Sequence, residues 1–176
     1  NHWAIIQSIK HIKKNNIDGE LVECGVFKGG NLILYKKIID QIGLEKKIYA
    51  YDTFEGMTRP GEFDKDLKNI NASDTFNKYK SAKVPWCYSS IKDVKKNISK
   101  FDINAEKDFV FIKGKVEETL LEKDNIPEKI SLLRLDTDFY ESTKIELELL
   151  FPRLQPGGVL IIDDYGHWKG SKKAVD

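Results

Sequence analysis

The pattern that most constrains the fold is a short apolar run followed by a helical stretch, repeated along the chain. Five apolar runs predict strands at 19–24, 47–52, 108–113, 130–135 and 158–162. Such continuous runs, bounded by turn residues, are typical of parallel strands buried on both faces. Helical periodicity accompanies them at 2–14, 29–42, 90–101, 116–121 and 141–154. Alternating strands and helices predict right-handed crossovers and a Rossmann-like, doubly wound, mainly parallel α/β sheet.

One connection interrupts this alternation. Residues 54–86 show no clear periodicity and contain Gly56, Pro60 and Pro85. Connections of this length are uncommon inside a compact domain, and many of them are functional. Because the segment follows the second predicted strand, it belongs to the carboxyl edge of the sheet, where α/β proteins bind ligands. We therefore expect a single domain, residues 1–176, with a lid-like insertion at about 54–86; a disordered insertion is the alternative.

The composition disfavours several classes of protein. Lys and Arg total 29 against 28 Asp and Glu, and such a balance does not suit nonspecific nucleic-acid binding, which neutralises many phosphates. The chain has no run of about 18 apolar residues and no signal-peptide pattern at its N-terminus. Cys24 and Cys87 are far apart and outside zinc-ligand spacing, which fits a reducing compartment. We expect a cytoplasmic protein without nucleic-acid or membrane partners; a homo-oligomer stays open.

The first predicted strand, turn and helix contain a glycine-rich segment, residues 23–30. Gly25 permits a tight turn, and Gly29 and Gly30 let a ligand approach the free N–H groups at the helix start. A dinucleotide fingerprint requires glycine at position 27, where this chain has Phe27. The turn therefore favours a cofactor without a pyrophosphate, such as S-adenosylmethionine, over NAD. A turn that binds nothing is the alternative.

Further candidate cofactor contacts lie at the ends of predicted strands. Asp52 ends the second strand, where an acidic side chain commonly accepts hydrogen bonds from a ribose diol. Thr53 adjoins it, and a turn cap formed by these two residues is the alternative. Glu23 ends the first strand and is expected to face the amino-acid end of the cofactor. Gly114 follows the third strand and is expected beside the adenine, with a plain strand-to-helix turn as an equal alternative.

Four aspartates follow the last two predicted strands: Asp136, Asp138, Asp163 and Asp164. Because the carboxyl ends of parallel strands share one edge, we expect these side chains to converge. Converging carboxylates repel one another and acquire raised pKa values unless a cation is present. Oxygen ligands without Cys or His suit Mg²⁺. The pattern predicts a magnesium site, because helix capping would explain only one or two of the four.

Four motifs occur in a fixed order, at 23–30, 51–57, 133–143 and 154–166. Together they resemble the macrocin O-methyltransferase family of bacterial sugar O-methyltransferases, over roughly residues 19–176. The resemblance implies Mg²⁺-dependent transfer of a methyl group from S-adenosylmethionine to a hydroxyl of a sugar or glycosylated small molecule. It also implies the division of the aspartates, with Asp136, Asp163 and Asp164 as metal ligands and Asp138 as general base.

The resemblance has one departure, and other functions stay open beside it. Seven-stranded members of this methyltransferase class add two strands after the fifth, and this chain ends before them, so we expect the last strands to be lacking. A non-catalytic S-adenosylmethionine-binding module is one alternative. A nucleotide-binding oxidoreductase is another, although Phe27 and the four aspartates suit it poorly. His167 is an alternative base, but a lone histidine of this kind is more often a packing or surface residue.

Overall fold

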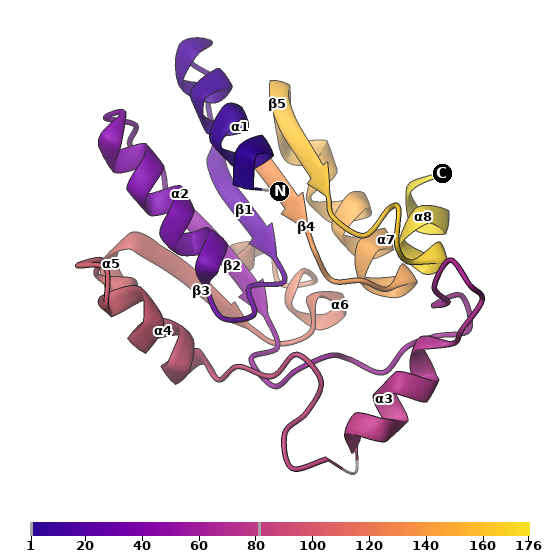
Figure 1. Cartoon of the computed structure of the whole chain (residues 1–176). Coiled ribbons are helices and arrows are strands. Elements are labelled where there is room, and N and C mark those ends of the chain that lie inside the picture. Colours follow the sequence, from indigo (N-terminus) through magenta and orange to yellow (C-terminus); the bar gives the residue numbers. More distant parts are fainter. Residues whose placement is uncertain (1, 81) are drawn as a thin grey trace.

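The computed structural model describes residues 2–80 and 82–176. Five parallel strands form one sheet in the order β3-β2-β1-β4-β5 (Figure 1). The strands are β1 (Glu20–Cys24), β2 (Ile48–Asp52), β3 (Phe109–Lys113), β4 (Ile130–Leu135) and β5 (Leu154–Ile162). The chain builds outward from β1 on one side and then returns to β4 on the other. The predicted Rossmann-like α/β sheet is confirmed, and its order reverses between β1 and β4.

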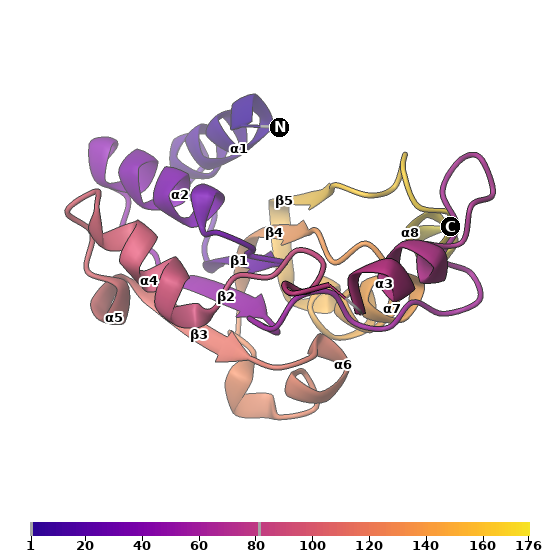
Figure 2. The same ribbon diagram turned by 60° about the horizontal axis from the view of Figure 1, so that its bottom comes forward.

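Helices cover both faces of this sheet. The helices of the described residues are α1 (His2–Lys14), α2 (Gly30–Gln41), α3 (Ala72–Lys80), α4 (Ile91–Ser99), α5 (Ala105–Asp108), α6 (Val116–Thr119), α7 (Tyr140–Leu149) and α8 (Lys169–Val175). Helices α1, α2 and α4 lie on one face, and α6 and α7 lie on the other (Figure 2). None of the helices within the described ranges is long and apolar enough to cross a membrane.

The central strands contribute side chains to both hydrophobic cores. Leu21 and Leu132 pack in the core under α1, α2 and α4, whereas Val22 and Leu133 pack in the core under α6 and α7. All four side chains are fully buried. Because adjacent residues of a strand point to opposite faces, a strand covered on both sides must be apolar throughout. This requirement explains the continuous apolar runs in the sequence.

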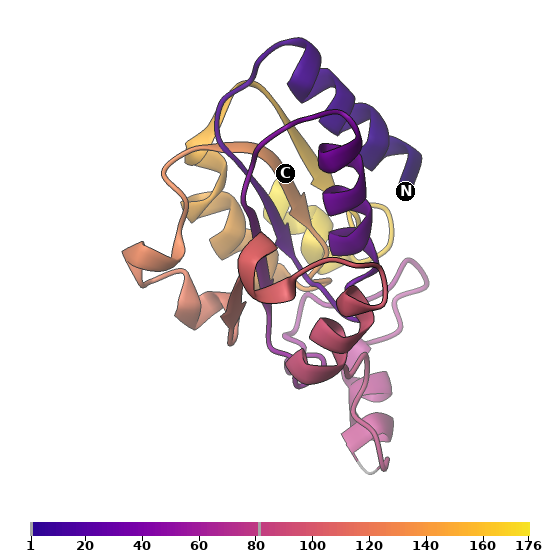
Figure 3. The same ribbon diagram turned by 90° about the vertical axis from the view of Figure 1, so that its left-hand side faces the viewer.

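The insertion contains a helix that the sequence analysis did not predict. Helix α3 lies beyond the carboxyl edge of the sheet, away from both cores (Figure 3). Its apolar residues Ala72, Phe76 and Tyr79 recur at helical spacing, but among the described residues of the helix only Ala72 is buried, so this short stripe gives a weak periodic signal in a polar segment. Helix α8 was also missed, because it buries the small residues Gly170 and Ser171.

The largest differences between predicted and observed boundaries are at the last strand and the helix before it. Strand β5 begins at Leu154 rather than at 158, because the Pro-Gly-Gly sequence after Gln155 continues the strand instead of turning. The predicted helix at 141–154 begins at Tyr140 and ends at Leu149, and a 3₁₀ turn follows it. The other strands lie within one residue of their predicted limits.

Candidate active site

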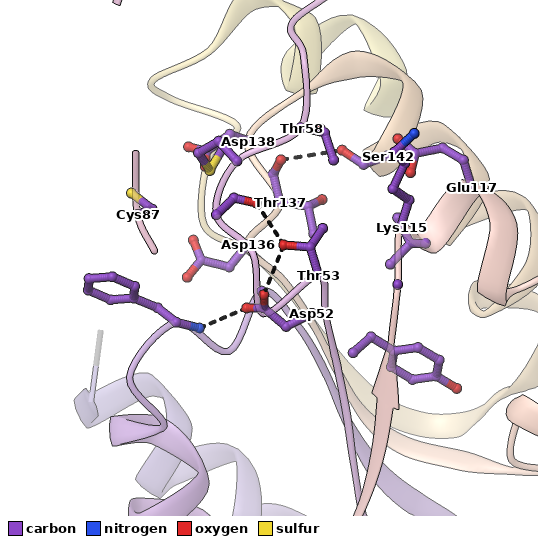
Figure 4. Close-up of a pocket in the computed structure, with 17 residues that line it drawn as sticks. Asp52, Thr53, Thr58, Cys87, Lys115, Glu117, Asp136, Thr137, Asp138 and Ser142 are labelled. Carbon is purple, nitrogen blue, oxygen red and sulfur yellow. Dashed lines mark hydrogen bonds between the residues drawn. The ribbon is translucent and has the colours of Figure 1, made fainter. Parts of the chain in front are cut away.

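A cavity of about 230 Å³ opens at the carboxyl edge of the sheet, at the strand-order reversal (Figure 4). Ligands of doubly wound folds bind at this kind of position. The described residues that line the cavity include six of the predicted site residues: Gly25, Asp52, Thr53, Gly114, Asp136 and Asp138. Lining residues that the sequence analysis did not single out include Met57, Thr58, Cys87, Lys115, Glu117, Thr137 and Ser142.

Gly25 allows the ends of β1 and β4 to meet at the floor of the cavity. Its φ is +88°, and a Cβ at this position would collide with the backbone carbonyl of Asp136. The Gly25 N–H donates to the carbonyl of Tyr51 at 2.9 Å. Any other residue would therefore have to push these strand ends apart, in a conformation that favours glycine.

Gly29 and Gly30 are not among the residues that line the cavity. Gly29 precedes α2 with a φ of +82°, and a Cβ there would lie 3.0 Å from Val94 Cγ1. It therefore bends the chain into α2 and lets that helix pack closely on α4. Gly30 has no neighbouring atom within 4 Å of its Cβ position. Contact of either glycine with a cofactor stays a prediction.

Asp52 joins the turn after β1 to the end of β2. Its Oδ2 accepts the N–H groups of Val26 at 2.8 Å and Phe27 at 2.9 Å, and its Oδ1 accepts that of Phe54 at 2.7 Å. These bonds make Asp52 a turn cap, the alternative noted above. Because a carboxylate offers about four acceptor sites, the cap leaves capacity for a ribose. Thr53 Oγ1 donates to the Gly56 carbonyl at 2.6 Å.

Glu23 lies behind the cavity rather than in it. The residue is fully buried, and its Oε1 accepts from Asn31 Nδ2 at 2.9 Å and from Arg134 Nη1 at 2.8 Å. Its Oε2 is buried without a hydrogen-bond partner among the described residues. Burial raises the pKa of Glu23 to about 7, against the opposing charge of Arg134.

Arg134 is the most important site residue that the sequence analysis missed. Its side chain is 4% exposed, and besides Glu23 it pairs with Asp136 Oδ2 at 2.9 Å and Asp163 Oδ2 at 3.4 Å. One buried cation therefore pairs with three carboxylates. A charged residue inside the apolar run 130–135 was the available signal, because such a residue is almost never buried unpaired.

The four aspartates do converge at one edge of the sheet. Trp168 Nε1 donates to Asp138 Oδ1 at 2.6 Å, and the Asp138 N–H donates to Asp164 Oδ2 at 3.0 Å. Burial raises the pKa values of Asp136 and Asp164, and the charges of neighbouring aspartates raise them further. Burial also raises the pKa of Asp138, although the Trp168 hydrogen bond opposes this shift.

The described residues, 2–80 and 82–176, contain no group of three or more His, Cys, Asp or Glu side chains in a metal-binding arrangement. Arg134 provides the reason, since it draws Asp136 and Asp163 toward its guanidinium. Asp164 instead directs Oδ2 to the backbone of Asp138. The predicted ligands are thus neighbours, but one oxygen of each is paired within the protein.

Comparison with known proteins identifies the family. Residues 4–176 match the family described as Macrocin-O-methyltransferase (TylF). An 8-demethyl-8-(2,3-dimethoxy-alpha-L-rhamnosyl)-tetracenomycin-C 4'-O-methyltransferase of Streptomyces olivaceus is 30% identical over 89% of this chain and 57% of its own. A demethyldecarbamoylnovobiocin O-methyltransferase of Streptomyces niveus is 30% identical over 98% of this chain and 62% of its own.

A solved structure of the O-methyltransferase NovP superposes with a TM-score of 0.83 at 28% identity, covering 99% of this chain and 69% of NovP. The calicheamicin methyltransferase CalS11 has the same fold at 20% identity and a TM-score of 0.72, covering 99% of this chain and 68% of CalS11. The chain thus spans less than two thirds of the length of the two curated Streptomyces relatives. Sequence, fold and position of the cavity lead to one conclusion: the chain belongs to the macrocin O-methyltransferase family.

Proposed function

We propose that this protein transfers a methyl group from S-adenosylmethionine to a hydroxyl of a sugar or glycosylated small molecule, with a requirement for Mg²⁺. The observation that best supports this reaction is a single cavity that contains both Asp52, beside the glycine turn, and the pair Asp136 and Asp138. Methyl transfer requires the donor and the acceptor to be held in line within one space. The tetracenomycin relative has a rhamnosyl group in the name of its substrate, which favours a glycosylated acceptor.

The proposed cofactor site joins three strand ends to the start of α2, and it comprises Glu23, Gly25, Gly29, Gly30, Asp52, Thr53 and Gly114. S-adenosylmethionine, when bound, supplies an electrophilic methyl group. The Gly25 turn leaves the backbone open to approach, and the remaining acceptor site of Asp52 would bind a ribose hydroxyl. Gly114 would face the adenine, and Glu23 would support the amino-acid end through Asn31.

The proposed metal ligands are Asp136, Asp163 and Asp164. Their oxygens are the donors that Mg²⁺ prefers. Burial raises the pKa of Asp136, and the charges of Asp164 and Asp163 raise it further, so a divalent cation beside them would relieve this repulsion. The metal, when bound, would supply a Lewis acid that lowers the pKa of the acceptor hydroxyl. Asp136 and Asp163 would then each interact with both the cation and Arg134.

Asp138 is the proposed general base. Its Oδ1 accepts the indole N–H of Trp168 at 2.6 Å, which fixes the carboxyl plane. Its Oδ2 would accept the proton of the acceptor hydroxyl. Burial raises the pKa of Asp138 toward neutrality, and a base is most effective when its pKa lies near the working pH.

Calorimetry and a methyl-transfer assay test this proposal together. We expect the protein to bind S-adenosylmethionine and not NADH, and to methylate at least one member of a sugar and glycoside panel when Mg²⁺ is added. Binding of NADH instead would favour an oxidoreductase. Binding of S-adenosylmethionine without transfer to any acceptor would favour a non-catalytic module.

Single substitutions test the division of roles. Asp138→Asn should lower turnover by roughly 10²–10⁴ while cofactor and Mg²⁺ still bind, whereas Asp136→Asn should weaken Mg²⁺ binding. Asp40→Asn, on the exposed surface of α2, is the matched control and should change neither. If Asp138→Asn loses Mg²⁺ as severely as Asp136→Asn, then Asp138 is a ligand and the division is wrong.

A further inference from the structure

The inserted segment is fastened to the helices that flank the proposed base. We call residues 61–72 the strap. Its central residue, Asp64, is 1% exposed. Asp64 Oδ1 accepts the N–H of Tyr140 at 2.8 Å, Oδ2 accepts that of Gly61 at 2.7 Å, and the Asp64 carbonyl accepts that of Ala72 at 2.9 Å.

Asp64 supplies the N-terminal cap of α7. Tyr140 is the first residue of this helix, and Phe139 in the cap position makes no side-chain capping bond. The first N–H groups of a helix have no partner within the helix, and a carboxylate there is favoured by both hydrogen bonding and the helix dipole. The chain thus uses an acid 76 residues away in the sequence for a cap that is ordinarily local.

The strap makes a second attachment on the other side of the base. Asp66 forms an isolated antiparallel bridge with Trp168, and the Lys169 N–H donates to the Lys65 carbonyl at 2.8 Å. In Figure 1 the loop that precedes α3 accordingly lies next to α8. Trp168 is the residue whose indole holds the carboxyl of Asp138. The strap therefore contacts the backbone that follows Asp138, at Tyr140. It also contacts Trp168, the residue that hydrogen-bonds the side chain of Asp138.

Residues of the strap, α7 and α8 pack closely around Asp64. A Cβ on Gly170 of α8 would collide with Asp64 Oδ1 and would lie 3.1 Å from the Tyr140 nitrogen. Phe63 packs edge-on against Tyr140 with ring centroids 4.9 Å apart. Lys173 Nζ lies 3.2 Å from the centroid of the Phe63 ring. A residue larger than glycine at position 170 would therefore displace the carboxylate of Asp64.

We propose that Asp64 is a positioning residue that holds Asp138 in its working orientation by capping α7 from the inserted segment. This inference rests on the proposed role of Asp138 as base. Asp138 has a φ of +68°, a left-handed conformation that is uncommon for residues other than glycine, although Asp adopts it more readily than most. The strap constrains this conformation through Tyr140 and Trp168. When the strap docks against α7 and α8, it therefore also orients the carboxylate of Asp138.

Two substitutions and one control test the proposal. In Asp64→Asn one acceptor oxygen becomes a donor, so only one of the two N–H bonds can remain. Gly170→Ala displaces the same carboxylate without changing charge. Asp74→Asn changes the charge by the same amount on an exposed position of α3 and is the control. Hydrogen exchange of the Tyr140 amide and the NMR signal of the Trp168 indole N–H report on the attachment directly, and Trp168→Phe assigns that signal.

We expect Tyr140 to exchange faster by on the order of tenfold or more in Asp64→Asn and Gly170→Ala, with a shifted Trp168 signal in both. Turnover should fall by about 10–100-fold, the effect of misplacing a reacting group, while the affinity for S-adenosylmethionine changes less than about twofold because no proposed cofactor contact moves. The control should match the wild-type protein in every measurement. Unchanged exchange and an unchanged Trp168 signal would overturn the proposal, as would normal turnover in a variant whose Tyr140 amide has lost its protection.

The outcome separates this inference from the proposed function. If Asp138→Asn keeps full turnover, the role of Asp138 as base fails, and the positioning role of Asp64 fails with it, whatever the exchange data show. If Asp138→Asn loses turnover but Asp64→Asn and Gly170→Ala do not, the base is correct and the positioning role alone is wrong. Thermal melting of each variant identifies any loss of turnover that comes from unfolding, and Gly170→Ala then serves as the deciding variant if Asp64→Asn does not fold.

Discussion

Replacing Arg134 by Met is expected to be among the most destabilising single changes in the core. Met preserves much of the apolar contact of the side chain but removes the cation that pairs with Glu23 at 2.8 Å and Asp136 at 2.9 Å. Glu23 is fully buried, so it would be left as an uncompensated charge. Breaking a buried pair in this way costs about 3–5 kcal/mol. Most of this cost arises at Glu23, because Asp136 is partly exposed.

Urea unfolding at pH 8, where Glu23 is mainly ionised, measures this cost. Arg134→Met should lower the free energy of unfolding by the amount above, and the double variant with Glu23→Gln should recover a large part of it, because the buried charge is then gone. Lys129→Met is the control, since Lys129 pairs with Asp18 on the exposed surface, where ion pairs contribute little. At pH 5 the loss in Arg134→Met should be smaller, because Glu23 can take up a proton.

Either of two results would refute this reasoning. A loss in Arg134→Met no larger than that in Lys129→Met would mean that the buried pair is balanced by its own desolvation. Additive losses in the double variant with Glu23→Gln would mean that Arg134 acts through packing rather than through its charge.

Three further predictions follow from the same geometry. Gly25→Ala should destabilise the fold by about 2 kcal/mol or more, since its φ of +88° and the carbonyl of Asp136 both oppose a side chain; thermal melting beside Gly166→Ala, where space is open, tests this, and equal melting temperatures would contradict it. The pKa of Glu23 is raised from 4.5 to about 7 in the folded state, so the folded state binds this proton more tightly; its contribution to stability is present below pH 4.5 and is lost as the pH rises through 7. Glu23→Gln should lack this dependence in unfolding curves, and the same slope in both proteins would show that another group titrates. Hydrogen exchange in the insertion, residues 54–80 and 82–86, should slow when S-adenosylmethionine and acceptor are added; identical exchange with and without them would make the insertion a passive one.

The strands and most of the helices could be predicted because their burial depends on their own residues. The run 130–135 coincides with β4 in the structure, since a strand covered on both faces must be apolar along its whole length. The site at the carboxyl edge followed from topology, because parallel strands bring their ends together. The convergence of Asp136, Asp138, Asp163 and Asp164 at this edge was therefore predictable from the sequence.

Pairings between distant residues could not be predicted in this way. Arg134 was an anomaly in an apolar run, but its partner Glu23 lies 111 residues earlier in the sequence, and no local period connects the two. Helices α3 and α8 were missed because, among the described residues, each buries only one or two small residues, which give a weak periodic signal.

The sequence by itself determined the fold class, the family and the edge of the sheet that carries the acids, because periodicity, turn glycines and motif order are properties of neighbouring residues. Only the tertiary structure decided what each acid does there: Asp52 caps a turn, Glu23 is sealed behind the cavity, and Asp64 reaches the start of α7. The physical reason is that a carboxylate is defined by its hydrogen-bond partners and its burial. Both depend on which distant segments the folded chain brings beside it.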